Sequence, residues 1–261
     1  MTTLPLLTVR RSLLEKAASD NGFDRGEAVH GDWLVLRSSQ CALTIALAAA
    51  PDGLYWLALS AQHVGEALQR ELGGWPPRAG LDLPAVAAAW VAGQPNIQAL
   101  HRALRRAFQL SRALPNALLH EFERVAVVLP TATEVERVVR QRVGQDLFRR
   151  GLLEFWDGRC AITGLAVPEL LRASHAKPWA DCESDAERLD VHNGLLLAPH
   201  LDALFDCGLM TVDPGGQVSF SRSIESDALH RLGVSGPLRV ALVAEHMRFL
   251  EWHRDRVFRP A

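Results

Sequence analysis

Two short stretches separated by a polar loop limit what this chain can fold into more than any other feature. The first, residues 174–179 (SHAKPW), stops at Pro178, and the second, residues 193–202 (NGLLLAPHLD), places Pro199 after an apolar run too short for a helix. Proline is disfavoured inside regular elements but favoured in the first turn of a helix. The pattern therefore predicts strand, loop, strand and helix, with His175 at a strand end opposite a helix N-terminus.

The residues before this region predict an α+β unit with a small antiparallel sheet. Helical spacing of apolar residues or short apolar runs between turn residues indicate a helix over 9–20, strands over 33–36, 41–47 and 54–60, and a helix over 61–72. After a Gly/Pro-rich break at 73–80, an alanine-rich run before Pro95 and a basic segment over 97–114 are both expected to be helical. The basic segment fits a solvated outer face or a surface that faces DNA.

A domain boundary is expected near Pro130, which divides the chain into residues 1–128 and 129–261. The second part begins with a basic helix over 134–156. On this helix Arg142 and Arg149 are seven residues apart and share a face with Gln145. Guanidinium groups at this spacing suit phosphates along a nucleic-acid backbone, and the glutamine suits a base or a phosphate. A face of salt bridges within the domain is the alternative.

Composition narrows the class of protein and the compartment. The formal net charge of −2 means that any nucleic-acid surface must be a local patch. No apolar run is long enough to cross a membrane, so no membrane association is expected. The four cysteines include no CxxC pair, which argues against a zinc ribbon or a disulfide framework and favours a reducing compartment. A cytoplasmic location is expected.

The residue types around the loop suit phosphodiester hydrolysis. His175 is the side chain whose proton affinity suits a general base near neutral pH, and Asn193 could hydrogen-bond across the loop to fix its ring. Asp202 and His200 offer a carboxylate and an imidazole to Mg²⁺ or Mn²⁺, and less strictly to Zn²⁺. Lys177 is placed to meet a phosphate.

Each of these residues also has an ordinary structural interpretation. A single histidine after a strand is often structural, and Asn-Gly before an apolar run is often only a turn. His200 and Asp202 are two residues apart, so they point to different sides of a regular helix. They can share one ion only if His200 precedes the first helical turn.

The stretch from about Arg142 to Phe220 resembles the HNH endonuclease family, in the branch of predicted restriction endonucleases. The residues that carry the resemblance are Arg142-Val143-Gly144-Gln145, Phe148-Arg149, Cys160, Thr163-Gly164, Ser174-His175, Lys177-Pro178-Trp179, Arg188-Leu189-Asp190, Asn193 to Leu197, His200 to Asp206 and Gly208-Leu209. The segment from Phe249 to Phe258 also resembles the way such proteins end.

The resemblance implies a ββα-metal fold and metal-dependent DNA cleavage. His175 matches the family's first histidine, the general base, and Asn193 matches its central asparagine. Ser174 stands where many members have a metal-binding aspartate, and Asp202 stands where they have the last histidine. His200 could then substitute for the missing carboxylate. Ala198 and Leu201 occupy the positions of the zinc-binding cysteine pair of some members, so no structural zinc is expected.

The leading hypothesis is a DNA endonuclease of restriction or defence against foreign DNA, in which the N-terminal domain selects the target. A double-strand cut by a single-site nuclease needs two copies or two events, which allows for a homodimer. A DNA-binding protein with a decayed nuclease domain is the second hypothesis, because Ser174 replaces the expected aspartate. A structural protein with satisfied polar groups is the third.

Overall fold

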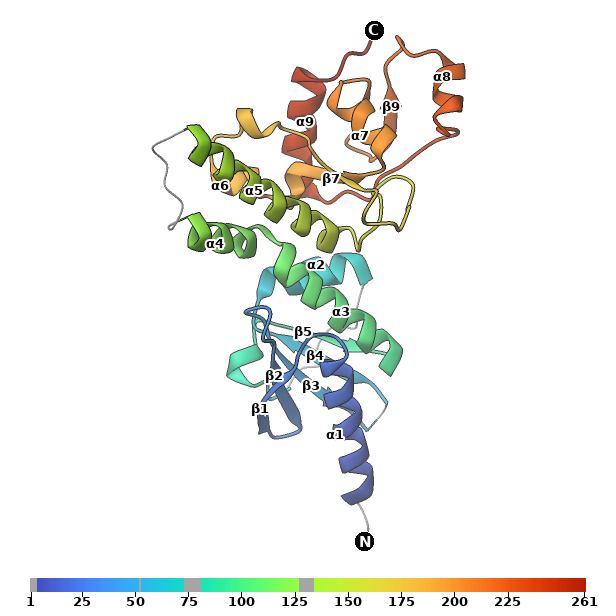
Figure 1. Cartoon of the computed structure of the whole chain (residues 1–261). Helices are drawn as coiled ribbons and strands as arrows, with labels where there is room; N and C mark the ends of the chain where they lie inside the picture. The colour runs from blue at the N-terminus through green and yellow to red at the C-terminus, as the bar shows by residue number, and fades with distance from the viewer. Residues whose placement is uncertain (1–3, 52, 73–80, 127–133) are drawn as a thin grey trace. The chain divides into compact units, whose positions relative to one another are not determined.

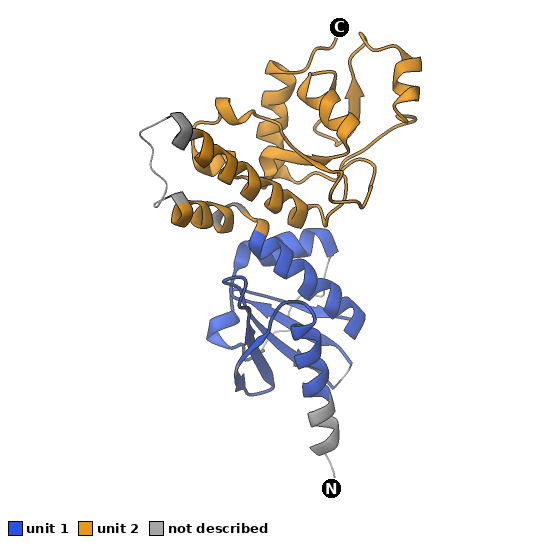
Figure 2. Ribbon diagram, in the orientation of Figure 1, with its two compact units in different colours: residues 1–112 blue, residues 113–261 orange. Residues whose placement is uncertain are grey.

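The computed structural model describes residues 4–51, 53–72, 81–126 and 134–261. They form two compact units, residues 1–112 and 113–261 (Figures 1 and 2). The boundary expected at 128/129 lies outside the described residues. The chain divides earlier because helix α4 (Pro115–Ala126) packs against helix α5 (Glu134–Phe155) of the second unit. No helix in the described ranges is long and apolar enough to cross a membrane.

Unit 1 is built on a five-stranded antiparallel sheet whose strands follow one another in chain order (Figure 1). The strands are β1 (Arg25–His30), β2 (Trp33–Arg37), β3 (Thr44–Ala49), β4 (Tyr55–Leu59) and β5 (Trp90–Gln94). The helices are α1 (Leu4–Ser19), α2 (Gln62–Leu72) and α3 (Ile97–Ala113), with a 3₁₀ turn η1 (Ala85–Ala87). The expected helices over 9–20, 61–72 and 97–114 and the three expected strands are confirmed.

Alternation along the strands gives this sheet two apolar faces. Leu34, Leu47 and Leu57 are register partners on one face, and β2 and β3 contact α1 while β4 and β5 contact α2. Trp33 and Trp56 lie on the other face, where they pack with alanines of β3 and β4 and with the segment around η1. Both faces are therefore covered, which explains why the strands have nearly continuous apolar sequences.

The alanine-rich run before Pro95 was expected to be a helix, and that expectation was wrong. It forms the short turn η1 and then strand β5, which pairs with β4. Pro84 and Pro95 leave few residues for a helix, and pairing with the sheet outweighs the helix propensity of alanine. Gly65 of α2 leaves room for the Trp90 side chain of β5, because a Cβ there would lie 2.2 Å from Cγ of Trp90.

Unit 2 confirms the predicted order of strand, loop, strand and helix. After α5 come β6 (Arg172–His175), η2 (Trp179–Asp181), α6 (Asp185–Arg188), η3 (Val191–Asn193), β7 (Gly194–Leu197) and α7 (Pro199–Asp206). The hairpin β8 (Met210–Val212) and β9 (Val218–Phe220), α8 (Ser226–Arg231), η4 (Ala244–His246) and α9 (Met247–Arg256) complete the unit.

Residues 159–164 form hydrogen-bonded turns. Cys160 organises them, because its Sγ accepts hydrogen bonds from the backbone N–H of Thr163 (3.4 Å) and of Ala198 (3.3 Å). Ala161 N–H also donates to the Leu196 carbonyl. The segment is thus tied to β7 through isolated bonds and not through a ladder.

The β6–β7 hairpin contacts α5 and α7. Its register pairs Ser174 with Leu195 and His175 with Gly194. Successive side chains of a strand point to opposite faces, so Ser174 and His175 face different helices. Ser174 meets α7 and His175 meets α5, which places the predicted base, His175, at the junction of three elements.

Candidate active site

The imidazole of His175 is held by one ring stack and one hydrogen bond. Its ring stacks on Phe148 of α5 at a centroid distance of 3.7 Å, and its Nε2 lies 2.9 Å from the carbonyl oxygen of Arg188. A carbonyl oxygen can only accept, so Nε2 carries the proton and Nδ1 keeps its lone pair. Burial lowers the pKa of His175 to about 4, although the bond to Arg188 acts in the opposite direction. The ring is therefore neutral at physiological pH.

The Arg188 carbonyl is fixed by the side chain of the same residue. The guanidinium donates to the carbonyl oxygens of Trp179 (3.1 Å) and Cys182 (2.7 Å) and pairs with Asp185 at 3.0 Å. These bonds close the loop between β6 and β7 on itself. The Arg188 carbonyl, which accepts the hydrogen bond from Nε2–H of His175, is thereby held in place by side chains of the loop.

Asn193 bridges the two ends of this loop and is fully buried. Its Oδ1 accepts from the backbone N–H of Lys177 (2.8 Å), and its Nδ2 donates to the carbonyls of Lys177 (3.1 Å) and Glu187 (3.2 Å). Its own carbonyl accepts from Ala176 N–H. Asn193 thus fixes the backbone directly after His175, and it acts on the peptide groups of the loop.

Lys177 was expected to meet a phosphate, but its ammonium is held inside the protein. Nζ lies 3.0 Å from both carboxylate oxygens of Glu187, and the residue is only 8% exposed. The hydrogen bond to Glu187 is the main reason that the pKa of Lys177 is raised. The lysine therefore ties β6 to α6, and this ion pair lowers the positive charge that it can offer to a phosphate.

The three predicted DNA-contacting residues of α5 have different surroundings. Arg142 and Gln145 are exposed. Arg149 instead donates to the carbonyl oxygens of Leu171 (2.5 Å) and Pro168 (2.8 Å), which anchors the segment that leads into β6. Only Arg142 and Gln145 are therefore presented to solvent as the sequence predicts.

Gly144 lies between these residues on α5 and permits close packing. A Cβ at Gly144 would lie 2.2 Å from Cη2 of Trp179. Gly194 is equally restricted, because a Cβ there would meet the Ser174 carbonyl oxygen at 2.5 Å and Cζ of Phe148 at 2.6 Å. Both glycines are needed for α5 to approach the hairpin closely enough for Phe148 to stack on His175.

On the opposite side of β6, Ser174 joins the hairpin to α7. Its hydroxyl donates to Oδ1 of Asp202, and Ser174 is 2% exposed. Asp206 lies one helical turn after Asp202, on the same side of α7. Burial and then the charge of Asp202 raise the pKa of Asp206 to about 6. Two carboxylates thus create a negative potential on the side of α7 that binds Ser174.

His200 lies within the first turn of α7, because this helix begins at Pro199. Two helical residues turn the direction by about 200°, so His200 and Asp202 point to different sides. The condition for sharing one ion is not met, and His200 as a ligand stays a prediction that the helix geometry does not favour. Within the described ranges, no three histidine, cysteine, aspartate or glutamate residues form a group able to hold a metal ion.

Phe148, Glu187 and Asp206 were not predicted as site residues, although Phe148 and Asp206 lie in segments that resemble the family. The contact between Phe148 and His175 depends on the packing of α5 against β6, which the sequence alone does not show. Only the helical spacing of Asp202 and Asp206 could have indicated a shared face in advance.

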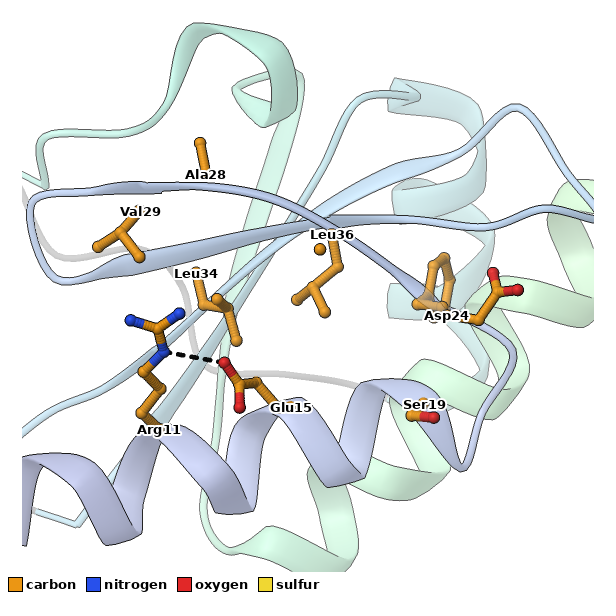
Figure 3. Close-up of a pocket in the computed structure, with 10 residues that line it drawn as sticks. Arg11, Glu15, Ser19, Asp24, Ala28, Val29, Leu34 and Leu36 are labelled. Atoms are coloured by element: carbon orange, nitrogen blue, oxygen red, sulfur yellow. Dashed lines mark hydrogen bonds and ion pairs between the residues drawn. The ribbon is translucent and has the colours of Figure 1, made fainter.

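A separate pocket of about 500 Å³ lies in unit 1 between α1 and the strands β1 and β2 (Figure 3). Leu34, Leu36 and Phe23 form part of its lining, and the ion pair between Arg11 and Glu15 lies at its edge. It contains none of the residues that the sequence assigns to catalysis. This pocket is therefore distinct from the site around His175.

Comparison with known proteins connects the site to one family. None of the curated proteins compared with the chain matches it. Residues 160–213, which contain β6, β7, α7 and β8, match the model of the family described as HNH endonuclease. His175, Asn193 and Asp202 all fall within the matched residues. The resemblance of this C-terminal part of the chain to the HNH endonuclease family is therefore confirmed.

Proposed function

We propose that this protein is a metal-dependent DNA endonuclease in which His175 is the general base. One observation carries the proposal: Nε2 of His175 lies 2.9 Å from the Arg188 carbonyl oxygen, which fixes the half-buried ring in the tautomer that leaves Nδ1 unprotonated. A general base needs a lone pair held in a defined direction at working pH. The family match over residues 160–213 supports a nuclease.

In this mechanism Nδ1 of His175 takes a proton from the attacking water, and the ring becomes an imidazolium. The Arg188 carbonyl stabilises that charge through the Nε2–H bond, and the stack on Phe148 prevents the ring from turning. Asn193 keeps the backbone of Ala176 and Lys177 in place. These residues hold and move one proton at a defined atom.

The carboxylate of Asp202 is the group best suited to hold a divalent cation. Ser174 fixes one of its oxygens, and Asp206 adds negative potential on the same side of α7. Mg²⁺ is commonly held by one or two carboxylates together with water and phosphate oxygens, so this small oxygen set fits Mg²⁺ or Mn²⁺ better than Zn²⁺. A bound ion would supply the charge that holds the scissile phosphate and stabilises the leaving oxygen.

DNA is the proposed substrate, and Arg142 and Gln145 are the proposed contacts on α5, since both are exposed. A role in restriction or defence rests on the family resemblance. Target selection by unit 1 and a homodimer that cuts both strands remain predictions. On a chain of net charge −2 the DNA-binding surface has to be a local patch.

The proposal is tested by Mg²⁺- or Mn²⁺-dependent nicking of plasmid DNA. His175→Ala should abolish nicking while leaving DNA affinity in place, and His230→Ala on α8 is a matched control because His230 is exposed and outside the matched residues. Nicking that persists in His175→Ala would refute the assignment of the base.

A decayed nuclease that only binds DNA is the second candidate, and Ser174 is the observation that favours it. Under that hypothesis the wild-type protein binds DNA and cuts none under any divalent ion. Ser174→Ala then tests whether Ser174 positions Asp202 for a metal ion or has no part in the ion site. If Ser174 positions Asp202, the substitution should weaken Mn²⁺ binding by about 10-fold or more. Unchanged Mn²⁺ affinity would remove Ser174 from the proposed ion site.

A further inference from the structure

Asp190 lies on the chain between Arg188, whose carbonyl binds the His175 ring, and Asn193, which fixes the backbone after His175. Arg188, whose carbonyl binds His175, is two residues before it, and Asn193 is three residues after it. Asp190 is only 6% exposed, and a buried carboxylate is costly unless several donors compensate it. The groups that donate hydrogen bonds to the Asp190 carboxylate therefore indicate its structural role.

Three donors reach the Asp190 carboxylate. Oδ1 accepts from the backbone N–H of His192 (2.9 Å) and from its Nδ1 (2.8 Å), and Oδ2 accepts from Nη2 of Arg248 (2.8 Å). The Asp190 carbonyl accepts from Asn193 N–H at 2.8 Å. Asp190 thus caps the short helix η3 and orients the peptide group of Asn193. Burial alone would raise the pKa of Asp190, but the hydrogen bonds and charge of His192 and Arg248 lower it.

Arg248 comes from helix α9, outside the residues that match the family model. The far end of α9 is also fixed, because His253 stacks on Phe205 of α7 at 3.8 Å and its Nε2 lies 3.1 Å from the Phe205 carbonyl oxygen. Phe249 and Leu250 are buried. Helix α9 therefore connects α7, which carries Asp202, with the turn that carries Asn193.

We propose that Asp190 and Arg248 are a positioning pair through which helix α9 fixes the turn between the Arg188 carbonyl and Asn193. The expected effect of this pair on the cleavage rate rests on the proposed nuclease function. Its expected effect on the tautomer of the His175 ring does not. Asp190 and Arg248 act through other residues and take no part in the proton transfer. The segment after residue 213 is thus part of the working site.

Arg248→Met tests the pair without disturbing the core, because 66% of the Arg248 side chain is exposed. The single-turnover cleavage rate at saturating DNA should fall by about 10-fold, as is usual when a partner that orients a site residue is lost. Arg248→Lys keeps the charge and should recover most of that rate. Arg256→Met, an exposed arginine of the same helix, should cut like the wild type. A loss confined to DNA affinity would overturn the proposal and make Arg248 a DNA contact.

A second readout is independent of cleavage. The ¹⁵N chemical shifts of the His175 imidazole should show Nε2–H in the wild-type protein and a mixture of tautomers in Arg248→Met and in Asp190→Asn. Because both changes break the same contact, the double variant should shift no further than either single one. Wild-type shifts in both variants would overturn the pair even if the protein cuts no DNA. Failure of nicking with these shifts altered as expected would overturn the nuclease assignment alone.

Discussion

Acid should destabilise unit 2 well before it protonates ordinary carboxylates, because three of its histidines, His175, His246 and His253, are held in neutral form. His246 and His253 are each 1% exposed, and burial is the main reason that their pKa values fall from 6.5 to about 4 in the folded chain. The unfolded chain takes up protons first as the pH falls below 6.5. Their contribution to stability is therefore complete above 6.5 and is lost as the pH falls toward 4.

The size of the effect follows from the two pKa values. Moving from about pH 7 to about pH 5 should lower the free energy of unfolding by about 2 kcal/mol for each histidine, and by about 6 kcal/mol for the three together. A loss of that size is a large fraction of the stability of a typical domain. It should appear as a lower urea midpoint, while the slope of the unfolding free energy against urea concentration stays unchanged.

Urea unfolding of the full chain, followed through the amide resonances of α9, measures this loss in unit 2. His253→Gln should reduce the loss between the two pH values by about a third, since one of the three titrating groups is gone. His230→Gln removes an exposed histidine and should leave the loss as it is in the wild type. The reasoning is refuted if His253→Gln loses as much stability in acid as the wild-type protein.

Three further predictions concern the packing around the candidate base. Gly144→Ala should lower the free energy of unfolding by about 1–3 kcal/mol, because the alanine Cβ would overlap Trp179. Glycine to alanine usually stabilises a helix, so a gain in stability measured by calorimetry would contradict this prediction. Phe148→Ala should cost about 3–5 kcal/mol in urea unfolding, since Phe148 is fully buried against His175, and a cost below about 1 kcal/mol would exclude that packing. In an NMR titration the His175 imidazole should protonate near pH 4, and a midpoint at 6.5 would show that the ring is hydrated.

The elements of unit 2 could be predicted where proline and glycine mark their ends. Pro178 and Pro199 limit the loop, β7 and α7, so the position of His175 at the end of β6 follows from local sequence. Strand β5 could not be predicted in the same way. Its alanines favour a helix by propensity, and only the pairing with β4 and the gap at Gly65 make it a strand.

The roles of charged side chains were harder to predict than the elements. Lys177 and Arg149 have the residue types and spacing of phosphate contacts, yet Glu187 and two backbone carbonyls bind them. A sequence shows that a cation is present but not which acceptor the fold brings to it. Arg142 and Gln145 keep the predicted exposure, although Arg149, on the same face of α5, binds backbone carbonyls.

The candidate base is held by a backbone carbonyl, and this has a consequence for how the site can vary. A carboxylate partner could be removed by one substitution, but the Arg188 carbonyl is displaced only if the loop changes shape. Residues that set the loop, such as Asn193 and Asp190, therefore control the His175 tautomer without touching the ring. Loss of activity in this domain can then arise from changes distant from both the base and the ion site. A serine at position 174 is compatible with an active site as long as that loop and Asp202 keep their places.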